Sequence, residues 1–254
     1  MNASSGVIEV SDLDVFYGRV QALAEVSCVF CDGITGVLGP NGAGKSTLFK
    51  VLTNTLAFQD GCIKRDGVEL VSAKTWKKHV ETVGYLPQDP GWVESFTVVE
   101  LCLYMAGLRS VPRKQRQVAA EQAIESVGLQ ERAKTQLRAL SGGMRRRAFL
   151  AQAIVHDPRV LILDEPTSGL DPVQRLRIRE LLACLGRTII LSTHLVEDVA
   201  HIAGAIVVLD KGHVVWQGSP DSLATKGDVG GSDRDTASVW ERGFMSVLYP
   251  ESEE

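Results

Sequence analysis

A glycine-rich segment in the first fifth of the chain has residue types suited to holding phosphate. Residues 39–46 read GPNGAGKS and fit the spacing G-x-x-x-x-G-K-S/T. Glycines let such a loop turn its backbone N–H groups toward one centre, and a following helix adds the positive end of its dipole. Lys45 would supply charge to the β- and γ-phosphates, and Ser46 would offer its hydroxyl to Mg²⁺. The alternative is an ordinary strand–helix turn. We expect the contacts to come from Gly39, Pro40, Asn41, Gly42, Ala43, Gly44, Lys45, Ser46 and Thr47.

A second candidate site follows an apolar run later in the chain. Residues 159–165 read RVLILDE, which indicates a buried strand that ends in two carboxylates. Ligands of parallel sheets bind at the carboxyl ends of the strands. Asp164 would therefore emerge near the phosphate loop and hold Mg²⁺ through water, and Glu165 would orient an attacking water and accept its proton. Taken alone, Asp-Glu after a strand is also explained as a helix cap.

The elements that must position these residues follow from hydrophobic periodicity. Short alternating runs indicate β-strands within 7–31, and residues 34–38 form an apolar strand that enters the glycine-rich loop, with a helix expected over 46–56. Apolar runs that alternate with helices indicate a parallel sheet covered on both faces. We therefore expect an α/β fold with a mixed or parallel sheet, an N-terminal antiparallel β portion and an inserted helical subdomain. The further expected strands are 62–70, 83–88, 160–164, 187–194 and 205–210.

The hydrophobic pattern and the composition along the chain also predict the domain organisation. Residues 1–225 form one domain, and the helical pattern at about 90–155 is inserted in it. Residues 226–236 have the composition of a flexible linker. The chain then ends in a short amphipathic piece with an acidic finish, so that 226–254 is expected to be a linker and tail.

Composition excludes several classes of protein. The chain has 254 residues, 44% of them hydrophobic, which fits a packed core and not a disordered chain. No apolar run reaches the ~18–20 residues that span a bilayer, and the N-terminus lacks the pattern of a signal peptide. Five cysteines are too few for a disulfide scaffold, and the lone pair Cys28 and Cys31 lacks the further ligands of a zinc site. The net charge of −4 argues against a nucleic-acid partner. Together these features indicate a reducing, cytoplasmic setting.

A third motif, LSGGMRRR, occupies residues 140–147. Ser141 is a good helix N-cap, and Gly142 and Gly143 would expose backbone N–H groups at the start of a helix. Three arginines in the first turn oppose the helix dipole, which is easier to explain if an anion lies there. A solvated basic helix face or a nucleic-acid patch is the alternative.

The three motifs together resemble the nucleotide-binding domain of an ATP-binding cassette (ABC) transporter, over about residues 7–222. LSGGM is similar to the family signature LSGGQ, and Met144 replaces the usual glutamine, which removes one polar side chain. The resemblance implies a P-loop NTPase core that binds ATP and Mg²⁺. It implies catalytic roles for Lys45 and Glu165, and Mg²⁺ contacts from Ser46 and Asp164.

The remaining elements of the family pattern occur in the expected order. Tyr17 matches the aromatic that stacks on adenine, although a strand-end core residue is the alternative. Gln88 matches the glutamine that touches Mg²⁺ and hinges to the helical subdomain, or else is a turn residue before Pro90. His194, after an apolar strand, matches the histidine that contacts the γ-phosphate and is counted as catalytic. Residues 168–171 match the loop that communicates across the dimer, or else cap a helix. Four histidines match no motif and are interpreted as structural or surface residues: His79, His156, His201 and His213.

The resemblance also implies partners. In the family two such domains face each other, as a homodimer or a heterodimer, and each ATP lies between the phosphate loop of one and the signature (here Ser141, Gly142 and Gly143) of the other. The chain would power a separate transmembrane permease at the inner face of the cell membrane. Its signature variant and residues 190–218 look more like those of exporters than of importers. The alternatives are a soluble ABC-type ATPase of translation or DNA repair, and a GTPase or small-molecule kinase; the N-K-x-D motif of a GTPase is absent.

Overall fold

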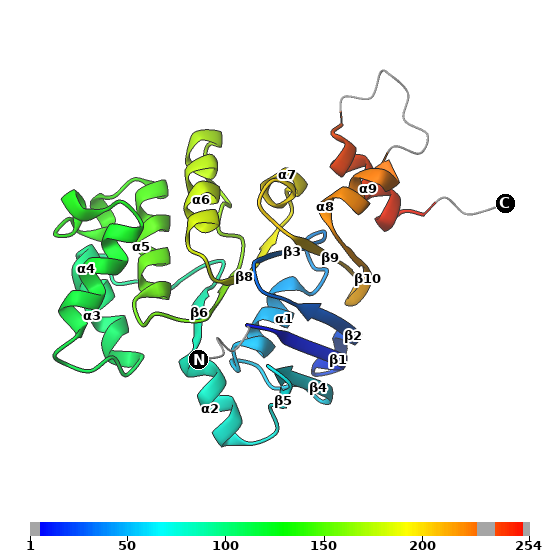
Figure 1. The fold of residues 1–254 in the computed structure, drawn as a ribbon, viewed down its shortest axis with the longest axis horizontal. Helices are drawn as coiled ribbons and strands as arrows, with labels where there is room; N and C mark the ends of the chain where they lie inside the picture. Colours follow the sequence, from blue (N-terminus) through cyan, green and yellow to red (C-terminus); the bar gives the residue numbers. More distant parts are fainter. Residues whose placement is uncertain (1–5, 228–236, 251–254) are drawn as a thin grey trace.

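The structure is a computed structural model that describes residues 6–227 and 237–250, and it contains two β-sheets (Figure 1). One is a four-stranded antiparallel sheet with the order β2-β1-β4-β5, and the other has six strands in the order β10-β9-β3-β8-β7-β6. The strands of the four-stranded sheet are β1 (Ile8–Tyr17), β2 (Val20–Phe30), β4 (Asp60–Arg65) and β5 (Val68–Glu69). Those of the six-stranded sheet are β3 (Ile34–Leu38), β6 (Val83–Leu86), β7 (Val160–Leu163), β8 (Thr188–Thr193), β9 (Ala205–Asp210) and β10 (His213–Gly218).

The six-stranded sheet is parallel from β9 to β6, and only β10 runs antiparallel to its neighbour. Every residue of β7 and of β8 is buried, which explains their nearly continuous apolar sequences. The expected α/β fold, with its antiparallel N-terminal portion, is therefore confirmed. Because the five strands are parallel, their carboxyl ends meet at one edge of the sheet.

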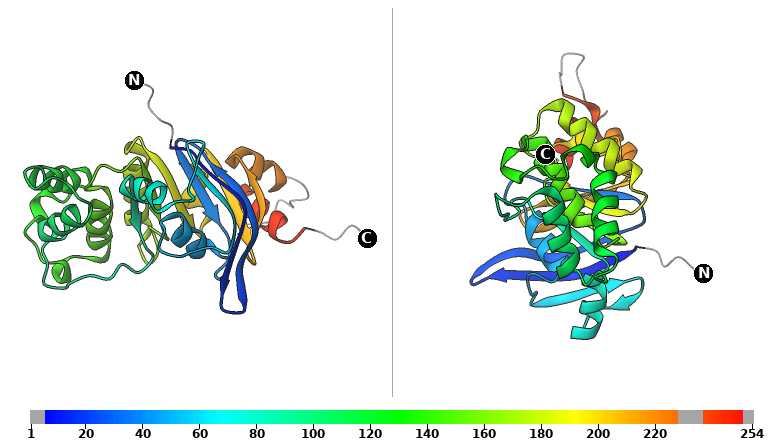
Figure 2. Two further views of the ribbon diagram at one scale, coloured as in Figure 1. Left: turned by 90° about the horizontal axis from the view of Figure 1, so that it is seen from below. Right: turned by 90° about the vertical axis from the view of Figure 1, so that its left-hand side faces the viewer.

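Helices and the second sheet cover the two faces of this central sheet. On one face, α1 (Lys45–Leu52) and the four-stranded sheet enclose a core that includes Phe30 and Phe49. On the other face, the remaining core includes Leu161, Leu163 and the apolar sides of the later helices. The helices α3 (Val98–Leu108), α4 (Arg116–Ser126) and α5 (Gly142–Ile154) lie together at one end of the molecule (Figure 2). The other helices are α2 (Ala73–Glu81), α6 (Pro172–Cys184), α7 (Val196–Ala200), α8 (Pro220–Gly227) and α9 (Val239–Leu248), with short 3₁₀ turns at Gln130–Arg132 and Leu137–Ala139.

The C-terminal region corrects the expected division of the chain at 225/226. That boundary falls inside α8, and the amphipathic piece forms α9, which packs on α8 and α7. The Trp240 ring lies 4.9 Å from the His201 ring, and Ser238 Oγ donates a hydrogen bond of 2.6 Å to Glu197 Oε1. The apolar face of α9 thus packs half-buried against the domain and does not belong to a separate tail. Residues 228–236 of the expected linker, and the acidic end at 251–254, lie outside the described residues.

Two histidines without a motif serve the fold. His79 is buried in α2, and its Nε2 lies 2.7 Å from the carbonyl oxygen of Leu52. Because a carbonyl only accepts, Nε2 carries a proton, while Nδ1 is buried without a hydrogen-bond partner among the described residues, a setting that favours the neutral ring. Burial lowers the pKa of His79 to about 4, and the hydrogen bond to Leu52 opposes this shift. His156, whose Nε2 lies 3.1 Å from Val83 O, has its pKa lowered to about 4 for the same main reason.

We predict that His79 makes the free energy of unfolding depend on pH between about 4 and 6.5. The unfolded chain binds a proton near pH 6.5 and the folded chain only near pH 4, so stability is complete above pH 6.5 and falls as the pH drops through this window. The loss is on the order of 3 kcal/mol. His79→Gln keeps a donor for Leu52 and removes the titration, so urea unfolding at several pH values should show a shallower decline. The exposed His213→Gln is the control. Equal pH dependence in wild type and His79→Gln would contradict the assignment.

Candidate functional site

The glycine-rich loop connects β3 to α1 and borders a cavity of about 590 Å³. Gly44 has φ +106°, and a Cβ there would lie 2.6 Å from Leu23 Cδ2, so both conformation and space require glycine. Because α1 begins at Lys45, the first N–H groups of this helix lack partners within it and are available to a ligand. The lining residues are Val20, Gln21, Ala22, Asn41, Gly42, Ala43, Gly44, Lys45, Ser46, Thr47, Gln88, Glu165, Lys211 and Gly212.

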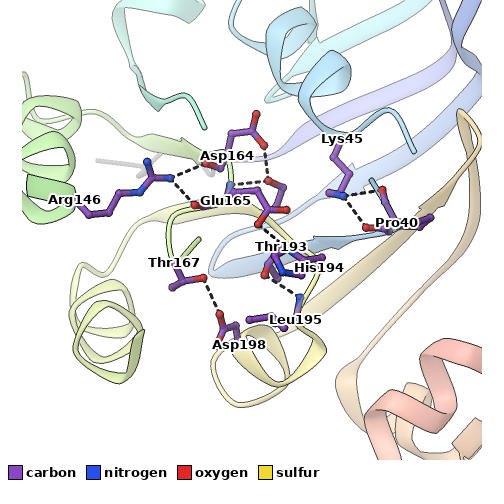
Figure 3. Close-up of polar contacts among 12 residues, drawn as sticks. Pro40, Lys45, Arg146, Asp164, Glu165, Thr167, Thr193, His194, Leu195 and Asp198 are labelled. Carbon is purple, nitrogen blue, oxygen red and sulfur yellow. Dashed lines mark hydrogen bonds and ion pairs between the residues drawn. The ribbon is translucent and has the colours of Figure 1, made fainter. Parts of the chain in front are cut away.

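Lys45 places a buried positive charge beside this cavity. Its side chain is 6% exposed, and Nζ donates hydrogen bonds of 2.6 and 3.0 Å to the carbonyl oxygens of Gly39 and Pro40 (Figure 3). Burial lowers the pKa of Lys45, while the carboxylates of Glu165 and Asp164 raise it. Lys45 and the two predicted carboxylates are therefore in one electrostatic environment, as the sequence predicted.

Asp164 and Glu165 leave the carboxyl end of β7 and are held by the neighbouring strand β8. Ser192 Oγ donates to Asp164 Oδ1 at 2.6 Å and accepts from the backbone N–H of Glu165 at 2.9 Å. This hydroxyl is fully buried and fixes both acidic residues at once. Sequence reasoning missed Ser192, and its only signal is a small polar residue that directly follows the apolar residues 189–191, two positions before His194.

Glu165 has an unusual backbone conformation. Its φ is +50°, a region that costs a residue with a side chain about 1–2 kcal/mol, so its surroundings must hold it there. Its Oε2 lies 3.0 Å from His194 Nδ1. The Glu165 side chain is 6% exposed and that of His194 is 49% exposed, so the pair reaches from the interior to the surface. Such a carboxylate is fixed in direction and accessible to a ligand through the cavity.

The predicted magnesium ligands offer a suitable set of donors. Ser46 and Gln88 line the cavity with Glu165, and Asp164 uses one carboxylate oxygen for Ser192 and keeps the second. Carboxylate, amide and hydroxyl oxygens are the ligands that Mg²⁺ prefers, usually together with phosphate oxygens. The residues present therefore fit a magnesium ion that enters with a nucleotide.

The start of α5 lies at a different cavity. Gly142 borders a hollow of about 300 Å³ with Arg145, Arg146 and residues 168–170, and Gln88 lines both cavities. Ser141 caps α5 by accepting from the N–H of Met144 at 3.2 Å. The structure of one chain thus keeps Ser141 and Gly142 apart from the cavity of Lys45. Gly143 is buried, and a Cβ there would lie 2.4 Å from Gln174 Oε1.

The three arginines of α5 have internal partners. Arg145 lies over the ring of Trp92 at 5.1 Å, and Arg147 Nη1 donates to Val127 O at 3.0 Å. Arg146 turns inward to backbone carbonyls near the carboxylates. These contacts explain the arginines without an anion, which corrects the argument drawn from their sequence position.

Tyr17 lies beside the cavity of Lys45 but is not among the residues that line it. It is the last residue of β1, is 45% exposed, and pairs across the hairpin with Val20, which lines the cavity. This exposure argues against the alternative of a core residue. Lys211 and Gly212, which follow β9, also line the cavity, and the sequence alone did not predict them as site residues. Asp171, by contrast, does cap a helix, because its Oδ1 accepts from the N–H of Gln174 at 3.0 Å.

Two further properties concern the described residues alone. Within 6–227 and 237–250, none of the helices combines the length and apolar character that crossing a membrane requires. In the same ranges, no three histidine, cysteine or acidic side chains gather into a group that could hold a metal ion. Cys28 is buried in β2, whereas Cys31 is exposed just after it.

Comparison with known proteins agrees with the geometry. The sequence profile of ABC transporters matches residues 27–168. An uncharacterised ABC transporter ATP-binding protein of Synechocystis is 36% identical over 79% of this chain and 57% of its own length. Nod factor export ATP-binding protein I of Mesorhizobium japonicum is 32% identical over 87% of this chain and 66% of its own length. This chain therefore spans about three fifths to two thirds of these relatives.

A solved structure shows the same fold. The protein cbiO1 from Clostridium perfringens, part of the ABC transporter complex cbiONQ, superposes with a TM-score of 0.78 at 30% identity, over 87% of this chain and 92% of that one. The profile match, the relatives and the arrangement of Lys45, Glu165 and His194 lead to one conclusion: the chain belongs to the ABC transporter family and carries the family's ATP-binding domain.

Proposed function

We propose that this chain binds ATP with Mg²⁺ in the 590 Å³ cavity and hydrolyses it to drive transport. One observation carries the proposal. Three neighbouring parallel strands, β3, β8 and β7, end at one edge of the sheet. The loops that follow them carry a lysine, a histidine and a carboxylate pair, and Glu165 Oε2 lies 3.0 Å from His194 Nδ1. A site of this kind works by positioning groups and by stabilising charge, since phosphoryl transfer needs little covalent chemistry from the protein.

Each residue has a role in this proposal. Lys45 and the first N–H groups of α1 bind the phosphates, and Tyr17 stacks on the base. Glu165 orients the attacking water and accepts its proton, while His194 contacts the γ-phosphate and keeps the Glu165 carboxylate in place. When bound, Mg²⁺ neutralises phosphate charge. Its ligands would be Ser46, Gln88 and Asp164.

The position of Ser141 favours a site completed by a second chain. The helix starts at Lys45 and at Gly142 each border a cavity, and the two cavities are different. A single γ-phosphate can use both only if they face it from opposite sides. We propose that two chains, identical or not, supply one start each, so that ATP holds the dimer closed.

The partners follow from the family. The relative in Mesorhizobium japonicum is named for Nod factor export, and the signature LSGGM with Met144 is interpreted as exporter-like. We propose that this chain powers export through a separate transmembrane permease, which would hold it at the inner face of the membrane. Movement would come from closure of the dimer on ATP and reopening after hydrolysis.

Replacement of Glu165 by glutamine tests the role of this carboxylate. Glu165→Gln keeps the shape of the side chain and removes the base, so ATP should still bind and close the dimer while turnover falls at least ~10²-fold. ATP hydrolysis and ATP-dependent dimerisation are measured together. Glu180→Gln, an exposed change on α6, is the matched control and should retain normal turnover. Near-normal turnover of Glu165→Gln would rule out this residue as the base.

Mixed dimers test whether the site is shared between chains. A Lys45→Ala chain paired with a Ser141→Arg chain keeps one complete site if each site uses Lys45 from one chain and Ser141 from the other. A wild-type chain paired with the double mutant then keeps none. The two chains carry different tags, each mixed dimer is purified, and its ATP hydrolysis is measured. Activity only in the pair of wild type and double mutant would mean that each site is built within one chain. If the natural partner is a different subunit, the same exchange is made across that pair.

A further inference from the structure

A single guanidinium group joins the carboxylate loop to two other parts of the molecule. Arg146 Nη2 donates to the carbonyl oxygens of Asp164, at 3.0 Å, and Glu165 (Figure 3). Its Nε donates to the carbonyl oxygen of Pro166 at 2.9 Å. Its Nη1 donates to the carbonyl oxygen of Gln88 at 3.1 Å. Three consecutive carbonyls of one loop and one carbonyl of another therefore face the same cation.

The partners of Arg146 are unusual for a buried charge. The residue is 9% exposed, yet within the described ranges its hydrogen bonds all go to backbone carbonyls and none to a carboxylate. Burial lowers its pKa, and the nearby charges of Asp164, Glu165 and Asp89 raise it. The planar fork of an arginine holds five donors in fixed directions, whereas the three donors of a lysine rotate about a single nitrogen. The arrangement therefore fixes backbone geometry rather than neutralising an acid.

The backbone that Arg146 fixes includes the strained residue of the site. Glu165 has φ +50°, and its carbonyl oxygen is held by Arg146 while its N–H is held by Ser192. The peptide groups before and after Glu165 are thus both held by hydrogen bonds, and these fix the direction in which its side chain leaves the backbone. Loss of the Arg146 contacts would free one side and let the carboxylate move away from His194.

We propose that Arg146 is a positioning residue for Glu165. It holds the backbone of residues 164–166 so that the carboxylate stays beside His194 and the cavity. Because Arg146 belongs to α5 and also binds Gln88, a shift of α5 or of the loop at Gln88 reaches the carboxylate through this one side chain. The inference rests on the proposed role of Glu165 in hydrolysis.

The test combines a conservative variant with a double-mutant cycle. Arg146→Lys keeps the charge and loses the fork, so kcat should fall at least ~10-fold while KM for ATP and the unfolding temperature change little. If Arg146 acts through Glu165, single-turnover hydrolysis in the Glu165→Gln background should change less than ~2-fold when Arg146→Lys is added. Arg147→Lys, whose side chain contacts Val127 and Gly128, is the matched control with normal kcat.

The following results for the Arg146 variants would overturn the proposal. Normal kcat in Arg146→Lys, or an equal fall in the wild-type and Glu165→Gln backgrounds, would show that Arg146 does not act through Glu165. Arg146→Gln, which keeps two donors, serves as a second variant. If neither variant unfolds cooperatively, Arg146 supports the fold as a whole and the proposal is overturned. A normal rate in Glu165→Gln alone would instead overturn the proposed role of Glu165, which separates the two failures.

Discussion

The parallel pairing of β3, β8 and β7 is the constraint on which the site depends. Leu38 pairs with Thr193, and Leu163 with Leu191, so the three strands end at nearly the same level of the sheet. In the sheet β8 lies between β3 and β7, although it is the last of these three strands in the sequence. The loops that follow these strands must therefore emerge side by side. This brings residues more than 100 positions apart, Lys45 and His194, to one edge.

Burial of charge at this edge is balanced by a small number of directed contacts. Lys45, Asp164, Glu165 and Arg146 are each 9% exposed or less. Removing such groups from water is costly unless each has hydrogen-bond partners, and here backbone carbonyls and the Ser192 hydroxyl provide them. The strands β7 and β8 that lead to this edge are buried throughout, and their apolar surroundings strengthen the electrostatic interactions of the groups next to them. A rigid polar centre in an apolar sheet is suited to a reaction that depends on positioned charge.

Much of the site was predictable because its motifs are local. The glycine-rich loop and the carboxylate pair are each contiguous in sequence, and the strand before each one could be read from its apolar run. Other features depend on contacts between distant segments. Ser192 acts 27 and 28 positions from its partners, and Arg146 binds carbonyls 18 to 58 positions away. No residue spacing encodes such contacts, because they follow from how the strands and α5 pack.

The two expectations that failed have the same physical origin. The arginines of α5 were interpreted from helix-dipole electrostatics alone, but a ring and several carbonyls supply partners that only the folded chain provides. The C-terminal piece was interpreted as a tail because residues 226–236 before it have the composition of a linker, yet the apolar face of α9 packs against α7 and α8. In both cases tertiary packing decided what local sequence left open.

Mg²⁺-dependent nucleotide affinity tests the central claim, that this edge receives a γ-phosphate with its metal. Equilibrium binding of ATP and of ADP is measured with and without Mg²⁺, in wild type and in Asp164→Asn, which keeps the hydrogen bond to Ser192 and removes the charge. We predict that Mg²⁺ tightens ATP binding to wild type at least ~10-fold, about 1.4 kcal/mol, and that Asp164→Asn loses this gain. Equal ATP affinity with and without Mg²⁺ in wild type, or an undiminished gain in Asp164→Asn, would contradict it.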